Sequence, residues 1–199
     1  LPAVEELAHR GYFALRMGSV VQKPLPATGP RVIDYAINGR TEFLDVYLSA
    51  KCRFFIGSTS GLFALPQTFR RPLVLTNFST LISVTTYGPN DLFIPKKLWS
   101  RRDQRLLSFH EHVDSGIAKF LNTEHFEQWD LDLIENTPEE ITAVVLEMED
   151  RLNGTWQTTE EDEELQRRFW SAFQNTGQNR LMLARIGTQF LRENTELLV

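Results

Sequence analysis

The sequence predicts an α/β fold in which short helices and strands alternate and build a parallel sheet. Three observations lead to this prediction. Apolar residues recur at helical spacing over 2–10 and 41–52. The run Phe54-Phe55-Ile56-Gly57 is continuously apolar, as is typical of a parallel strand buried on both faces. The links between helices and strands are short, which favours right-handed crossovers between neighbouring parallel strands.

The local signals place each element of the first half in turn. Gly11 serves as a left-handed helix cap and Thr41 as an N-cap, while three prolines break the chain between residues 19 and 30. We therefore expect, in order, a helix over 2–10, a strand over 12–15, a loop over 19–30, a strand over 31–36, a helix from Thr41, a strand over 54–57, a short helix from Leu62 to near Pro66, and a strand over 71–77.

The second half contains fewer strand signals and more helix signals. Residues 78–109 look irregular, and 131–134 form the expected last strand. Two capping boxes, Thr137–Glu140 and Thr158–Glu161, each begin a helix with a continuous apolar face. We expect a single domain over 1–199 whose helical part, 137–199, covers or flanks the sheet. The strand over 54–57 is expected to be central, with parallel neighbours at 12–15, 31–36 and 72–76.

A Rossmann-like sheet normally begins with a strand, whereas this sequence begins with a helix. We therefore expect a Rossmann-like three-layer parallel sheet that is truncated before its first strand. The chain would then be a fragment of a longer protein.

Composition and charge narrow the classes of function. The 199 residues are 42% hydrophobic and 24% charged, which is typical of a globular protein, and no apolar run suggests a transmembrane segment or signal peptide. A single cysteine, Cys52, favours a reducing cytoplasm. Residues 1–110 carry a net charge of +7 and residues 111–199 one of −12. The basic half suits an anionic small ligand, and no aromatic–basic stacking pattern supports nucleic-acid binding.

The turn Gly57-Ser58-Thr59-Ser60-Gly61 is the strongest candidate site. It follows the buried strand and opens a helix, so it belongs at the carboxyl edge of the sheet, where its N–H groups and hydroxyls can hold a phosphate. Arg16 can pair with a diphosphate, and Asp45 can accept two N–H groups of a base. Asp34 and Tyr35 end the next strand and can line the same crevice. The alternatives are a simple helix cap, a carboxylate on a helix dipole and a surface arginine.

Other reactive residues are weaker candidates. Thr59 stands where a hydrolase nucleophile elbow requires serine. His110, His112 and His125 have no recognisable triad context, and histidines two positions apart do not share a helix face. The pair Asp130 and Asp132 precedes rather than follows a strand, so we interpret it as structural. The sequence thus predicts no metal site and leaves the catalytic residues unknown.

Several segments carry a resemblance to known proteins. RVIDYA (31–36), TEFLDVYLSAKCRFFIGSTSGL (41–62) and FRRPLVLTNF (69–78) resemble a bacterial family of predicted glycosyltransferases. The similarity continues through LFIPKKLW, ENTPEEI, LNGTW, LQRRFW and RIGTQFLRENTELL. The stretch FLDVYLSAKCRFFIGSTSG also resembles, more distantly, the donor-binding half of GDP-fucose-dependent fucosyltransferases. In those enzymes an Asp before the buried strand contacts guanine and a Ser/Thr turn contacts phosphate; the matching positions are Asp45 and 59–61.

The resemblance implies the donor-binding half of a GT-B-like, metal-independent glycosyltransferase that makes a bacterial surface polysaccharide in the cytoplasm. Its donor would be a nucleotide sugar such as a GDP-sugar, with no further cofactor. The expected donor-binding residues are Arg16, Asp34, Asp45, Ser58, Thr59, Ser60 and Gly61. Such relatives carry a His-x-Arg on a preceding strand and an N-terminal acceptor domain, both missing here, so we expect this fragment alone to be inactive. An α/β hydrolase using Thr59 or Ser60 and a non-catalytic nucleotide-sugar-binding module remain alternatives.

Overall fold

The computed structural model describes residues 1–26, 29–58, 60–81, 88–174 and 183–199. Its helices are α1 (Pro2–His9), α2 (Glu42–Lys51), α3 (Ala64–Thr68), α4 (Phe109–Asp114), α5 (Thr123–Gln128), α6 (Pro138–Asn153), α7 (Glu160–Ser171) and α8 (Thr188–Glu193), with 3-10 turns η1 (Gly61–Phe63), η3 (Ile117–Lys119) and η4 (Thr195–Leu198). Its strands are β1 (Ala14–Leu15), β2 (Val32–Ile33), β3 (Phe55–Gly57), β4 (Leu73–Phe78), β5 (Leu92–Pro95), β6 (Lys97–Ser100), β7 (Arg105–Leu106), β8 (Leu131–Ile134) and β9 (Arg185–Ile186).

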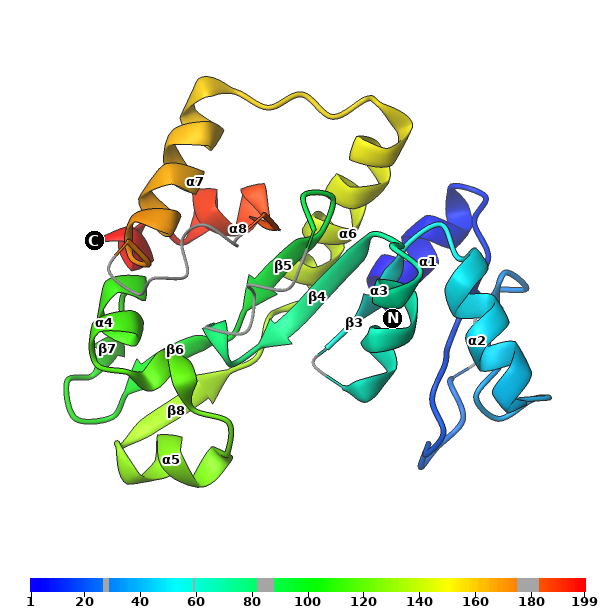
Figure 1. The fold of residues 1–199 in the computed structure, drawn as a ribbon, viewed down its shortest axis with the longest axis horizontal. Helices are drawn as coiled ribbons and strands as arrows, with labels where there is room; N and C mark the ends of the chain where they lie inside the picture. The colour runs from blue at the N-terminus through cyan, green and yellow to red at the C-terminus, as the bar shows by residue number, and fades with distance from the viewer. Residues whose placement is uncertain (27–28, 59, 82–87, 175–182) are drawn as a thin grey trace.

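A parallel sheet of four strands, in the order β3-β4-β5-β9, forms the centre of the molecule (Figure 1). Its two inner strands are almost entirely buried, as expected of parallel strands covered on both faces. The chain therefore has a mixed α/β fold with a parallel sheet, and this arrangement is compatible with a Rossmann-like layout.

The predicted order of the strands is wrong at β3. This strand lies at the edge of the four-stranded sheet and pairs only with β4 among the described strands. Its residues Phe55 to Gly57 are half-buried rather than fully buried. β1 and β2 pair with each other in parallel, as a separate two-stranded sheet. The apolar run correctly indicated a parallel strand, but it carries no information about which neighbours that strand finds.

The segment predicted to be irregular contains regular structure. β6 follows β5 after the single residue Lys96 and pairs in antiparallel fashion with β7 and β8. The segment 131–134 is therefore a strand, as predicted, but it belongs to this second sheet, and β9 follows it. Asn77 and Asn136 join the two sheets: each backbone N–H donates to the other's side-chain oxygen, at 2.6 and 2.7 Å.

The helix starts agree closely with the capping signals. Thr137 and Glu140 form the predicted box at the start of α6. The box of α7 consists of Thr159 and Asp162, one residue later than predicted. The short helix expected to end near Pro66 comprises η1 and α3 and continues to Thr68. None of the helices in the described ranges is long and apolar enough to cross a bilayer.

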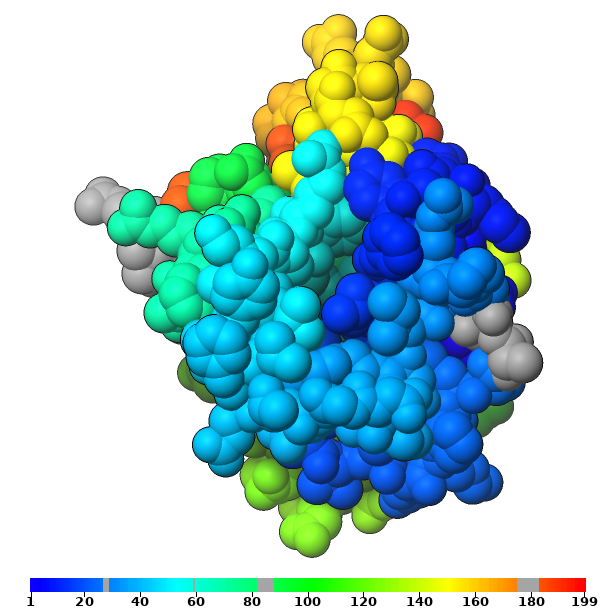
Figure 2. Space-filling view, turned by 90° about the vertical axis from the view of Figure 1, so that its right-hand side faces the viewer, coloured from blue at the N-terminus to red at the C-terminus, as the bar shows by residue number. Residues whose placement is uncertain are grey.

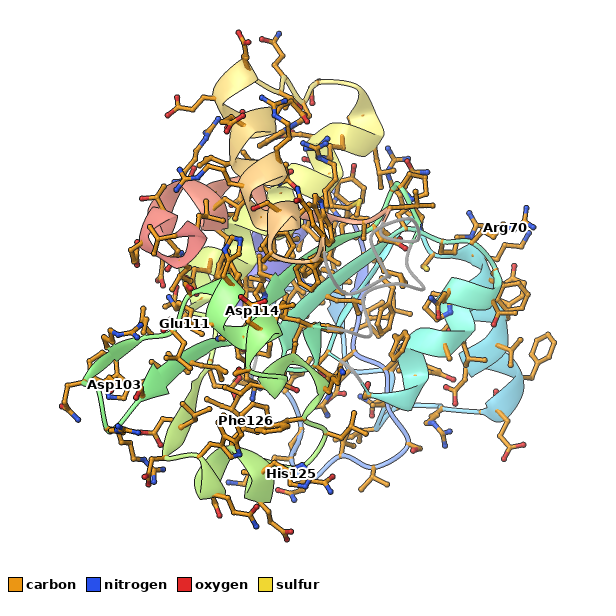
Figure 3. All side chains as sticks on the ribbon, turned by 60° about the vertical axis from the view of Figure 1, so that its left-hand side comes forward. Arg70, Asp103, Glu111, Asp114, His125 and Phe126 are labelled. Carbon is orange, nitrogen blue, oxygen red and sulfur yellow. The ribbon has the colours of Figure 1, made fainter. Side chains whose placement is uncertain are left out.

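Two apolar cores hold these elements together. The larger lies between the parallel sheet and helices α1, α6, α7 and α8, and Phe93 of β5 packs there against Phe169 and Trp170. The smaller lies between α5 and the antiparallel sheet, where Phe126, labelled in Figure 3, packs with Leu98 and Leu131. The larger core thus fixes β3, which leads to the candidate turn, through the partly buried side chains of Phe55 and Ile56.

Candidate functional site

A groove of about 680 Å³ separates the two-stranded sheet from the four-stranded sheet. Residues 12–17, which include β1, form one wall, and residues 51–58, which include β3, form the other. Side chains of α1 and α2, among them Leu7 and Leu48, close the remaining sides. In Figure 2 the blue N-terminal segment and the cyan segment around β3 stand on either side of this hollow.

The groove lies where the order of the strands reverses. On one side of the groove β1 pairs with β2, and on the other side β3 pairs with β4, which β5 and β9 follow in the same sheet. In open α/β sheets, ligands bind at such a switch point, outside the carboxyl ends of the strands. Arg16 follows β1, and Ser58 and Ser60 follow β3; all three line the groove. The structure therefore brings these three predicted residues together.

The charged residues that line the groove are all basic. They are Arg16, Lys51 and Arg53, and no carboxylate belongs to the described lining. Arg53 is already engaged, because its guanidinium donates to the carbonyl of Leu152 and the side chain of Asn153. The remaining positive charge favours an anionic ligand at this place. Sequence reasoning missed Lys51 and Arg53, because no motif marks residues that merely flank a strand.

Asp34 holds Arg16 in position instead of lining the groove. The guanidinium donates to both carboxylate oxygens, at 2.8 and 2.9 Å, and also to the carbonyl of Lys23 at 2.9 Å. The same carboxylate accepts the N–H of Leu25 at 2.8 Å. Of the five N–H bonds of a guanidinium, these contacts occupy three, so two remain for a ligand. Asp34 thus fixes the direction of Arg16 and partly balances its charge.

Asp45 is occupied by contacts within the protein. It is buried on α2, accepts the hydroxyl of Tyr35 at 3.0 Å and accepts the guanidinium of Arg40 at 2.6 Å. The same tyrosine hydroxyl also accepts the N–H of Thr41, the N-cap of α2. Neither Asp45 nor Tyr35 lines the groove. The carboxylate therefore ties the end of β2 to the start of α2.

We expect Asp45→Asn to lower the free energy of unfolding by about 1–3 kcal/mol, because a charge-assisted bond to Arg40 is replaced by a neutral one. Affinity for any ligand of the groove should stay within about twofold, a change of only a few tenths of a kcal/mol. Denaturant titration and calorimetry on the same preparation measure both effects. Unchanged stability together with a clear loss of nucleotide affinity would return Asp45 to the binding site.

Ser58 and Ser60, which follow β3, are both exposed. The N–H of Ser60 donates to the carbonyl of Ser58 at 2.8 Å, and Ser60 begins η1 without a side-chain cap bond. A side chain added at Gly61 would meet no protein atom within 4 Å, although Gly61 itself does not line the groove. Thr59 lies outside the described residues. Within the described part of the chain, the Ser60 hydroxyl and the N–H groups of Gly61 and Leu62 have no hydrogen-bond partner, so they can donate to a ligand.

The other polar candidates take structural roles. Burial raises the pKa of the Cys52 thiol, which donates to the carbonyl of Ser49. Burial also lowers the pKa of His112 on α4 to about 4, and its ring packs edge-on against Phe109.

His125 lies on α5, well apart from Glu111 of α4 in Figure 3. Asp132 pairs with Arg101. No cluster of metal-binding side chains occurs within the described ranges.

Comparison with known proteins adds no relative. No protein-family model, no curated protein and no solved structure matches this chain.

Proposed function

We propose that the chain binds the diphosphate of a nucleotide sugar in the part of the groove that lies at the carboxyl ends of β1 and β3. We further propose that the chain is the donor-binding half of a metal-independent, GT-B-like glycosyltransferase. The observation that carries this proposal is the position of Arg16, Ser58 and Ser60 at one switch point, on a groove whose charged lining is basic. The resemblance of residues 31–78 to glycosyltransferases supports the same substrate class.

The chemistry of such a transfer requires stabilisation of the leaving diphosphate. The lining of the groove offers donors for this purpose. They are the two N–H bonds of Arg16 that no described residue accepts, the hydroxyls of Ser58 and Ser60, and the N–H of Leu62. Donors that are fixed before the reaction stabilise developing negative charge without reorganising. Asp34 holds the guanidinium in its direction, and Asp45 takes no part in the proposal. The chain would act on a glycan acceptor held by an N-terminal domain of the same enzyme.

The hydrolase alternative finds less support. A serine nucleophile needs a base within hydrogen-bond reach, usually a histidine. No histidine belongs to the described lining of the groove. The ring of His110 contacts the hydroxyl of Ser171 on α7 instead.

Calorimetric titration with GDP, ADP, UDP and CDP tests the proposal directly. We expect at least one of them to bind, and the double change Ser58→Ala with Ser60→Ala to weaken binding roughly a hundredfold, since each bond to a charged oxygen contributes about 1.5–3 kcal/mol. Gly61→Val should leave the melting temperature unchanged, because the added side chain meets no protein atom within 4 Å, and should change the affinity little, because Gly61 does not line the groove.

Thr142→Ala is the matched control, because its hydroxyl donates to the carbonyl of Pro138 on α6 and Thr142 does not line the groove. This variant should bind nucleotide like the wild type. Absence of binding for all four nucleotides, or a Ser58/Ser60 variant with wild-type affinity, would contradict the proposal.

A further inference from the structure

A second cavity, of about 300 Å³, lies at the amino ends of the strands of the parallel sheet. Leu92, the first residue of β5, and Arg185, the first residue of β9, both line it, together with Arg151 near the end of α6. In Figure 1 the turn before β5 lies beside α6 and below the segment that leads from α6 to α7. None of the described residues lines both this cavity and the groove between β1 and β3. We call it the arginine cavity, after Arg151 and Arg185.

The end of α6 places Trp156 over Arg151. Gly154 ends the helix in a left-handed conformation at φ 72°. The N–H groups of Thr155 and Trp156 then donate to the carbonyl of Asp150, at 2.9 and 3.2 Å, so the chain turns back along the helix. The guanidinium carbon of Arg151 lies 5.1 Å from the centroid of the Trp156 ring. Such a stack fixes the guanidinium plane and leaves its edge for planar contacts.

Both arginines keep donors that no described carboxylate or carbonyl accepts. Nε of Arg151 donates to Glu147 at 2.9 Å, whereas its Nη1 donates to no residue in the described ranges. Arg185 donates to Glu163 through both terminal nitrogens, at 3.3 and 2.7 Å, and its Nε is buried without an acceptor in the described chain. A buried donor that lacks an acceptor costs free energy, so proteins usually supply a partner, a water molecule or an ion. The Nε of Arg185 therefore indicates that an acceptor belongs here.

The rest of the lining favours an anion with a small organic part. The hydroxyl oxygen of Thr158 accepts the indole N–H of Trp156 at 3.2 Å, so its own hydrogen can be donated. The described lining contains no carboxylate, and Glu147 accepts the N–H and hydroxyl of Thr188, at 2.7 and 2.9 Å. The buried side chains of Leu92 and Met148 add apolar surface. Pockets of this kind, apolar with a few placed polar groups, are typical of small-molecule sites.

We propose that the arginine cavity binds a phosphate monoester. The phosphate would accept hydrogen bonds from Arg151, Arg185 and Thr158, and the organic part would lie against Leu92 and Met148. Arginine pairs with phosphate through two parallel N–H bonds, and a tetrahedral phosphate offers acceptor oxygens in several directions. This second anion site lies at the opposite edge of the sheet from the nucleotide site and does not depend on it.

NMR of the arginine Nε–H groups tests the site during titration with inorganic phosphate and with phenyl phosphate. We expect the signals of Arg151 and Arg185 to shift and saturate with both probes, and sodium chloride at the same ionic strength to leave them in place. Phenyl phosphate should bind roughly tenfold more tightly than inorganic phosphate, because its ring adds apolar contacts. Arg185→Gln should weaken binding at least roughly tenfold, and its melting temperature reports whether the variant is folded.

A pair of neighbouring glutamates provides a variant with its matched control. Glu163→Gln removes the carboxylate that competes for Arg185, so phenyl phosphate should bind roughly two- to fivefold more tightly. Glu164→Gln changes the net charge equally, but Glu164 pairs with Arg167 outside the lining, so the affinity should stay unchanged. A gain in affinity cannot result from loss of folding.

Three results would each refute the arginine cavity as a monoester site. They are unshifted signals of Arg151 and Arg185 with both probes, equal affinities for the two probes, and equal affinities of Glu163→Gln and Glu164→Gln. The titration uses no nucleotide and follows residues outside the groove between β1 and β3 except for Arg16 and Arg53, whose signals are read separately. Failure here therefore leaves the proposed donor site standing, and the reverse holds too.

Discussion

Phe93→Ala is expected to lower the free energy of unfolding by about 3–5 kcal/mol, the usual cost of removing a fully buried phenylalanine. Phe93 lies in the middle of the parallel sheet, between β4 and β9, and its side chain has no exposed surface. Its ring centroid lies 6.1 Å from that of Phe78 and 5.7 Å from that of Phe169. The alanine variant would leave a cavity that the surrounding strands cannot close. Urea titration monitored by circular dichroism measures the loss.

Phe43→Ala provides the control for this substitution. Phe43 lies on α2, is 74% exposed and stacks on Tyr47. Removing it should cost less than about 0.5 kcal/mol, as is usual for surface positions. Equal losses for Phe43→Ala and Phe93→Ala would show that β5 is not in the core.

Acidification between pH 6.5 and pH 4 is expected to remove about 3 kcal/mol of stability through His112 alone. Burial lowers the pKa of His112 to about 4 in the folded protein, whereas an unfolded histidine titrates near 6.5. Between these values the unfolded chain binds a proton that the folded chain does not, so falling pH favours unfolding. Above pH 6.5 the contribution is fully present, and below pH 4 no more is lost. The free energy of unfolding, measured at half-unit pH steps, reveals the slope.

His112→Phe should remove this pH dependence, because phenylalanine fills a similar volume and cannot bind a proton. His9→Gln is the control, since the side chain of His9 is 81% exposed. If the free energy of unfolding of His112→Phe fell as steeply between pH 6.5 and pH 4 as that of the wild type, His112 would not be the group responsible. All other titratable groups are the same in the wild type and in His112→Phe, so their contributions cancel in that comparison.

The sequence was most informative where a few neighbouring residues determine the structure. Thr41 and the box of Thr137 with Glu140 satisfy backbone groups within one turn of helix, so their effect is visible in a short window. The alternation of helices and strands up to residue 78 was confirmed for the same reason. The shift of the second box to Thr159 reflects two threonines in succession, either of which can cap the helix.

Partners distant in the chain were not predictable in this way. The run from Phe54 to Gly57 indicated a strand, but its place at the edge depends on how β1 and β2 pair elsewhere. The carboxylate of Asp45 suggested a ligand contact, and its partner Tyr35 lies ten residues earlier, on another element. Strands β5, β6 and β7 escaped prediction because each has at most four residues and the pattern changes at Lys96. In the candidate site, the predicted order of helices and strands was enough to place Arg16, Ser58 and Ser60 at the ends of strands. The ion pair between Asp34 and Arg16 could not be predicted in this way.

The reciprocal bonds between Asn77 and Asn136 have a consequence for how the molecule comes apart. Asn77 adopts a left-handed backbone conformation at φ 54°, and Asn136 also donates from its side-chain amide to the carbonyl of Pro95. These hydrogen bonds link β4 and β5 of the parallel sheet to the end of β8 in the antiparallel sheet, at the point where β5 leads into β6. Force applied to one sheet is transmitted to the other through these short bonds. We therefore expect the antiparallel sheet and the parallel sheet to unfold together in one cooperative transition, without an intermediate in which only one of them is folded.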